Sequence, residues 1–288
     1  MKKLNLAKFL VFSMIVVFTQ SSCGDASDEE VEKVDLSDLK LVWSDEFDSG
    51  TVPSKNNWTA EVWNPGKVNN EVQYYKDSEK NAYVSDGSLK IKAYKEDGNW
   101  YSARLKTEKL HSWKYGYFEA KIKMPAGKGV WPAFWMMPEN IMDENGKDTG
   151  GGVYGIWPRS GEIDIMEYSP STTQSAVYST VHHSTSASNQ QADTYQSLGR
   201  KEIGDATTQW HTYGLLWTEN YIKAIYDGKE LDKIYYKPKR TEDNWVEWPY
   251  DQNFYIILNL AMGGVLGGAI DSALTEAIYE IDYVRVYQ

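Results

Sequence analysis

The sequence predicts an all-β protein, a sandwich or a barrel, and three observations support this. Apolar and polar residues alternate over many short runs, as in strands that bury one face. Asp86-Gly87 and Asp227-Gly228 have the composition of two-residue hairpin turns. No long helical period, internal repeat or change of composition follows residue 40, which favours a single large domain.

The expected strands succeed one another along most of the chain and are rich in β-branched and aromatic residues. They lie at residues 41–47, 83–84, 88–94, 117–124, 161–168, 176–182, 211–217, 222–227, 254–260 and 279–287. Gly, Asp, Asn and Pro separate them, and these residues are typical of turns.

The strand at residues 161–168 reads Gly-Glu-Ile-Asp-Ile-Met-Glu-Tyr and carries three acids. Successive side chains of a strand point to opposite faces, so Glu162 and Asp164 would share one face and the two isoleucines the other. Glu167 has the opposite parity and would point into the core, where an unpaired charge is very costly. One extra residue near Ile165-Met166, a β-bulge, would return Glu167 to the face of the other acids.

Carboxylates grouped in this way suit retaining glycoside hydrolysis, in which a nucleophile and a general acid/base lie roughly 5–5.5 Å apart. We expect Glu162 to be the nucleophile and Glu167 the acid/base. Asp164 lies between them, so the three acids would titrate as a coupled set. The same alternation is also typical of a solvated strand face without a catalytic role, and the eight residues alone leave both interpretations open.

Composition narrows the class of partner. With 12 Trp and 21 Tyr, the chain has many flat amphipathic rings, which suit contacts with the faces of sugar rings. The net charge of −11, without a block of Lys and Arg, argues against a nucleic-acid partner, whereas a neutral polysaccharide would be indifferent to it. One cysteine excludes an internal disulfide.

The first 39 residues predict export. Residues 1–22 have the positive start, short apolar run and small-residue end of a signal peptide, and the run is too short for a mature transmembrane helix. Cys23 resembles the lipidated first residue of a bacterial lipoprotein, and residues 23–39 read as an acidic tether. This predicts an outer-membrane or cell-surface lipoprotein of a Gram-negative bacterium, whose only membrane contact is the anchor at Cys23. The alternative is a free cysteine in a removed peptide.

Further motifs run through residues 40–288. They are Trp43-Ser-Asp-Glu-Phe47, Asn69-Asn-Glu-Val-Gln-Tyr-Tyr75, Asp86-Gly-Ser-Leu, Tyr101-Ser-Ala-Arg104, Tyr115-Gly-Tyr-Phe-Glu-Ala120, Val130-Trp-Pro-Ala-Phe-Trp-Met, Trp157-Pro-Arg-Ser ahead of the acids, Leu258-Asn-Leu-Ala-Met-Gly-Gly264 and Ile281-Asp-Tyr-Val-Arg-Val-Tyr287. With these motifs the chain resembles glycoside hydrolase family 16, in its laminarinase-like (endo-β-1,3-glucanase) branch with the bulged catalytic motif.

The resemblance implies a jelly-roll β-sandwich, concanavalin A-like, of two curved antiparallel sheets with a substrate cleft on the concave face. It implies retaining endo-hydrolysis of β-1,3-glucosidic bonds in laminarin-type β-glucan by double displacement. Catalysis would need no cofactor, and we expect a monomer. No His, Cys and Asp cluster has the spacing of a catalytic zinc site.

The resemblance also assigns binding residues. Asn70 and Arg104 match positions that hold sugar hydroxyls, and relatives carry a histidine near the acid/base where this chain has His182. Three tryptophans match cleft tryptophans, Trp131, Trp135 and Trp157. Core packing of one tryptophan and a structural role for Arg104 remain alternatives. A structural calcium ion would be held by three oxygen donors, from Glu46, the Gly87 carbonyl and Asp282.

Two departures from the family pattern keep other substrates open. Relatives often carry Gly-Asn-Trp-Pro-Gly after the Leu-Asn-Leu-Ala strand, but residues 264–268 read Gly-Val-Leu-Gly-Gly and lack that tryptophan. The loop at residues 138–152 is long and rich in glycine. Mixed-linkage β-1,3/1,4-glucanase (lichenase) activity is therefore the first alternative. A non-catalytic, lectin-like glucan-binding protein and an agarase-type galactan hydrolase are further alternatives; net acidity argues against sulfated galactans.

Overall fold

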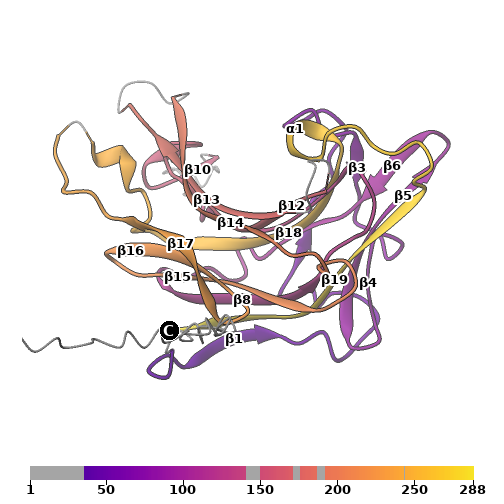
Figure 1. The fold of residues 1–288 in the computed structure, drawn as a ribbon, viewed down its shortest axis with the longest axis horizontal. Helices are drawn as coiled ribbons and strands as arrows, with labels where there is room; N and C mark the ends of the chain where they lie inside the picture. The colour runs from indigo at the N-terminus through magenta and orange to yellow at the C-terminus, as the bar shows by residue number, and fades with distance from the viewer. Residues whose placement is uncertain (1–35, 141–149, 171–175, 187–191, 243) are drawn as a thin grey trace, which may run out of the picture. The chain divides into compact units, whose positions relative to one another are not determined.

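Two curved sheets lie face to face in the computed structural model, which describes residues 36–140, 150–170, 176–186, 192–242 and 244–288 (Figure 1). One sheet has ten strands: β1 (Leu41–Asp45), β3 (Gln73–Tyr75), β4 (Ala82–Ser85), β5 (Ser88–Glu96), β6 (Asn99–Ser102), β8 (Gly116–Lys123), β15 (His211–Trp217), β16 (Tyr221–Tyr226), β17 (Lys229–Tyr236) and β19 (Glu276–Tyr287). The other has seven: β2 (Thr59–Ala60), β7 (Arg104–Lys106), β9 (Val130–Pro138), β12 (Glu162–Ser169), β13 (Ala176–Ser184), β14 (Asp193–Glu202) and β18 (Phe254–Met262).

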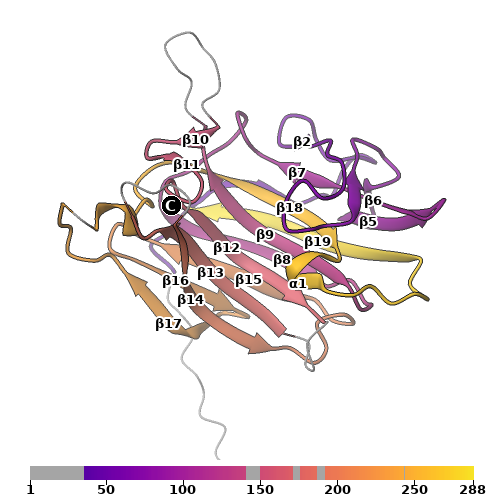
Figure 2. The same cartoon turned by 90° about the horizontal axis from the view of Figure 1, so that it is seen from above.

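The order of strands confirms the predicted jelly-roll sandwich. The ten-stranded sheet runs β17-β16-β15-β8-β19-β5-β6-β3, with β1 paired to β19 and β4 to β5. The seven-stranded sheet runs β14-β13-β12-β9-β18-β7-β2, and Figure 2 shows its strands from above. A helical turn, α1 (Gly264–Gly267), and the small hairpin of β10 (Gly151–Gly152) and β11 (Gly155–Ile156) lie beyond opposite ends of β12 (Figure 2).

The expected strands and both hairpin turns are present. Asp86 and Gly87 join β4 to β5 with φ of 52° and 70°, and Asp227 and Gly228 join β16 to β17 with φ of 52° and 73°. Two positive φ angles in succession are the conformation that such turns require.

Sequence alternation does not predict several short strands, nor three long ones, β9, β14 and β17. Two of them, β14 and β17, are edge strands with many exposed, charged residues, so no apolar alternation reveals them. The third, β9, is buried on both faces and begins and ends near prolines, which are unusual in a central strand.

The core between the two sheets holds the inner face of β12, the strand that carries the three acids. On β12, Ile163, Ile165 and Met166 are fully buried. The Tyr226 hydroxyl, from the opposite sheet, donates a hydrogen bond to the Ile165 carbonyl at 2.7 Å. The acids of β12 must therefore be presented on the opposite, outer face, which Figure 1 shows to be concave.

Some predictions fall outside the described residues. They include the signal peptide (1–22), lipidated Cys23, most of the acidic tether (23–39) and the central part of the 138–152 loop. Within the described ranges, no helix is long and apolar enough to cross a membrane.

Candidate active site

The strand β12 contains the extra residue that the parity of its acids requires. Asp164 pairs with Thr180 of β13, and Glu167 pairs with Tyr178, so three steps on β12 correspond to two on β13. The register with β9 shifts over the same stretch, since Asp164 pairs with Trp135 and Glu167 with Ala133. This shift turns Glu167 to the outer face, where it is partly exposed, as Glu162 is, while Asp164 is buried between them.

Neighbouring strands supply hydrogen bonds to the acids. Thr180 donates to Asp164 Oδ2 at 2.6 Å, and the Trp131 indole donates to Glu167 Oε1 at 2.9 Å. One carboxylate oxygen each of Glu162 and Asp164 and a ring nitrogen of His182 all lie within 4.8 Å of one another. Two of the predicted acids and the predicted histidine therefore form one cluster, and the charges of Asp164 and His182 both act on Glu167.

A second carboxylate holds His182. Its Nδ1 lies 3.2 Å from Oδ1 of Asp193 on the edge strand β14, and its Nε2 lies 3.4 Å from Asp164 Oδ2. Sequence reasoning missed Asp193, because nothing in a polar edge strand reveals which of its residues meets the histidine.

Burial raises the pKa values of all three acids. It raises the pKa of Glu162 to about 7, with a further contribution from the charge of Glu167, while a hydrogen bond from Asp164 acts in the opposite direction. Burial and the charge of Asp164 raise the pKa of Glu167 to about 8, although the Trp131 hydrogen bond lowers it. Burial and the neighbouring Glu162 raise the pKa of Asp164 well above its usual range. Of the two glutamates, Glu162 therefore ionises first, and Glu167 keeps its proton near neutral pH.

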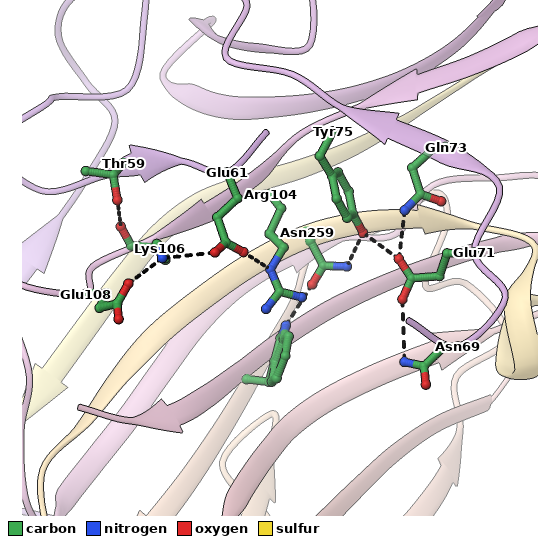
Figure 3. Close-up of polar contacts among 11 residues, drawn as sticks. Thr59, Glu61, Asn69, Glu71, Gln73, Tyr75, Arg104, Lys106, Glu108 and Asn259 are labelled. Carbon is green, nitrogen blue, oxygen red and sulfur yellow. Dashed lines mark hydrogen bonds and ion pairs between the residues drawn. The ribbon is translucent and has the colours of Figure 1, made fainter. Parts of the chain in front are cut away.

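Arg104 lies near enough to Glu162 for its charge to lower the pKa of that acid, and it forms an ion pair and ring contacts within the protein. Its Nε lies 2.5 Å from Glu61 Oε2, and its guanidinium carbon lies 4.3 Å and 4.6 Å from the ring centroids of Trp63 and Trp135. Figure 3 shows Glu61 between Arg104 and Lys106. The contacts therefore support the structural role that the sequence left open for Arg104. No feature of the sequence indicated that Glu61 and Trp63 would contact Arg104.

The amide of Asn259 links this ion pair to a second polar group. Asn259 accepts a hydrogen bond from the Trp135 indole at 2.7 Å and donates one to the Tyr75 hydroxyl at 3.0 Å. Tyr75 in turn donates to Glu71, which also accepts from Gln73 at 2.7 Å (Figure 3). Trp135 is thus fixed by both its ring face and its nitrogen.

The three predicted tryptophans differ in exposure. Trp131 is only 8% exposed, so its part is to hold Glu167 rather than to offer a ring face. Trp157 is 38% exposed, and its ring centroid lies 6.2 Å from that of His182, so it can stack on a ligand beside the acids.

The predicted binding residue Asn70 is exposed and has a φ angle of 57°. It follows Asn69, whose carbonyl accepts a hydrogen bond from the backbone N–H of Val265 at the start of α1.

The predicted calcium ligands lie on the ten-stranded sheet, and cationic side chains contact two of them. Arg285 donates two hydrogen bonds to Glu46, at 3.0 and 2.8 Å, and Lys121 lies 2.7 Å from Asp282. Gly87 is in the turn beside Leu89, which pairs with Ile281. The oxygen donors suit a hard cation, but calcium would have to displace both ion pairs.

Calcium binding therefore stays a prediction, and thermal unfolding checks it. We expect calcium, compared with EDTA, to raise Tm if the ion displaces Lys121 and Arg285, and Asp282→Asn should remove that increase. Equal Tm values in calcium and EDTA would show that the ion pairs hold these carboxylates instead.

Comparison with known proteins identifies the family. The model of glycosyl hydrolases family 16 matches residues 69–285. A β-glucanase from Rhodothermus marinus is 40% identical over 260 residues, which cover 86% of this chain and 85% of that protein. LamAcat from Zobellia galactanivorans has a TM-score of 0.72 at 33% identity, covering 86% of this chain and 97% of that one. SCLam, a non-specific endo-β-1,3(4)-glucanase, has a TM-score of 0.75 at 33% identity, covering 89% and 94%. The chain therefore belongs to glycosyl hydrolase family 16 and is a glycoside hydrolase.

Proposed function

We propose that this glycoside hydrolase cleaves internal β-1,3-glucosidic bonds of laminarin-type glucans with retention of configuration. The observation that carries the proposal is the bulged strand β12, which presents Glu162 and Glu167 on one concave face with Asp164 between them. The similarity to endo-β-1,3(4)-glucanases and laminarinases of family 16 supports the choice of substrate.

The reaction would proceed in two displacements. Glu162 attacks the anomeric carbon while Glu167 gives its proton to the glycosidic oxygen, and the carbon–oxygen bond to the leaving sugar breaks. Water then attacks the glycosyl ester, Glu167 takes the proton of that water, and Glu162 leaves as a carboxylate. A hydrogen bond from Asp164 to Glu162 stabilises the charge of the nucleophile, and Trp131 holds Glu167.

The raised pKa values predict a narrow pH optimum. Activity needs Glu162 ionised and Glu167 protonated, so kcat/KM should fall below about pH 7 and again above about pH 8. Asp164 donates to Glu162 while it is protonated and adds a negative charge beside Glu167 once it ionises. The amide of Asp164→Asn still donates but never carries that charge, so the alkaline limb should move to lower pH. The pH profiles of both proteins check this, and a flat profile from pH 5 to 9 would contradict it.

The turn α1 makes mixed-linkage activity the main alternative. In the sequence it stands where relatives often carry a tryptophan-containing motif, and it presents Val265, which is 69% exposed, instead of an aromatic ring. A smaller side chain there constrains the bound glucan less, which favours acceptance of β-1,3/1,4 chains.

A panel of polysaccharides tests the proposal. We expect the purified protein to release reducing sugars from laminarin and curdlan, with a ladder of product sizes that marks internal cleavage. Cleavage of barley mixed-linkage glucan alone would establish the first alternative, and cleavage of agarose the galactanase. Binding to laminarin without cleavage of any polysaccharide would establish a lectin-like protein.

A further inference from the structure

The position of β12 within its sheet means that a bound polysaccharide needs support on two sides. The nucleophile and the acid/base lie along one strand, so a glycan whose scissile bond lies between them runs across the strands. The strands β9, β18, β7 and β2 lie on one side of β12, and β13 and β14 lie on the other. Trp131, Trp135 and Arg104, which the family resemblance assigned to sugar binding, all lie on the first side. An enzyme that cleaves internal bonds must also bind sugar over β13 and β14.

The pairing registers show which residues face outward there. Glu167 pairs with Tyr178 of β13, which pairs with Arg200 of β14. Glu162 pairs with His182, which pairs with Tyr195. Directly paired residues point to the same face of a sheet, so two rows of side chains lead from the acids to the sheet edge.

The buried residues on the other face of β13 and β14 confirm that these two rows of side chains point outward. Val177 and Val181 of β13 and Leu198 of β14 are fully buried and belong to the core between the two sheets. Tyr178 and His182 alternate with these valines along β13, so they point away from the core.

The side chains at the end of the rows have the chemistry of a sugar platform. Tyr195 is 61% exposed, and its ring centroid lies 5.9 Å from that of His182. The Arg200 guanidinium lies 5.7 Å from the centroid of the Tyr178 ring, and its Nη1 bonds Glu202 at 2.9 Å. Aromatic rings stack on the C–H face of a pyranose, while guanidinium and phenol groups bond its hydroxyls.

We propose that Tyr195, Tyr178 and Arg200 form a second sugar-binding platform, for the glucosyl units on the β13 side of the scissile bond. The inference rests on the proposed glucan hydrolysis and extends it. From β12 to β14 the sheet spans about 10 Å, which accommodates more than one pyranose ring. The platform would fix where along the glucan the enzyme cuts.

Tyr195→Ala is the direct test, because this exposed side chain can be removed without disturbing the core. Tyr236→Ala is the matched control, since Tyr236 is 63% exposed on β17 of the other sheet. We expect Tyr195→Ala to raise KM for laminarihexaose about 3- to 10-fold with little change in kcat, and to shift the cleavage position of the end-labelled hexaose. Arg200→Ala should shift it in the same direction, and Tyr236→Ala should match the wild type.

Two outcomes would overturn the platform. One is a Tyr195→Ala protein with the KM and product pattern of Tyr236→Ala. The other is a loss of kcat at unchanged KM, which would mean that Tyr195 only positions His182. If the wild type cleaves no glucan, the proposed function fails separately. Calorimetry of laminarihexaose binding to Glu162→Gln, with and without Tyr195→Ala, then decides the platform: weaker binding supports it, and equal affinity refutes it.

Discussion

Replacing Glu162 by glutamine is expected to lower kcat/KM on laminarin by at least about 10⁴-fold. The amide has the size of the carboxylate but cannot form the glycosyl ester, so the first displacement is lost. The fold should persist, because the isoleucines and Met166 that anchor β12 are unchanged. Reducing-sugar assays measure the loss, and laminarin binding by calorimetry shows that the site is still formed.

The same substitution should affect stability in a pH-dependent way. An unfolded glutamate has a pKa of about 4.3, whereas burial raises the pKa of Glu162 in the folded protein to about 7. The raised pKa means that ionisation costs stability as the pH rises through 7, and glutamine removes this cost. We expect Glu162→Gln to raise Tm at pH 8 more than at pH 5. Glu276→Gln on β19 serves as a surface control, and hydrolysis at the wild-type rate by Glu162→Gln would refute its role as nucleophile.

Replacing Arg104 by methionine is expected to destabilise the protein by about 3 kcal/mol, because the change leaves a buried carboxylate with one partner fewer. Glu61 would keep Lys106, at 2.9 Å, and the rings of Trp63 and Trp135 would lose the cation between them. For a chain of this size the loss corresponds to a fall in Tm of about 6–12 °C. Thermal and urea unfolding both measure it.

Glu61, the ion-pair partner of Arg104, provides the control for Arg104→Met. Although burial raises the pKa of Glu61, Arg104 and Lys106 lower it more, so the ion pair stabilises the fold at neutral pH and loses that effect as the carboxyl protonates in acid. Adding Glu61→Gln to Arg104→Met should therefore recover part of the lost stability. If Arg104→Met melts with the wild type but binds laminarin poorly, Arg104 serves the sugar rather than the fold.

The sequence by itself determined much of the architecture and the reactive centre. Alternation and hairpin turns are local properties, so the strands and the turns at Asp86 and Asp227 followed from neighbouring residues. The bulge in β12 followed from parity, because a carboxylate in the core would be too costly. Parity alone therefore places the three acids on one face of β12, without reference to any long-range contact.

Only the tertiary structure decided what surrounds the acids. Arg104 meets Glu61 and Trp63, and His182 meets Asp193, because strands far apart or unrecognisable in the sequence are neighbours in the sheet. The edge strand β14 is polar on its exposed positions and gave no alternation to read, yet its register with β13 brings Tyr195 and Arg200 into line with the acids. Side-chain partners depend on which strands pair and in which register, and those are properties of the whole sheet rather than of any segment.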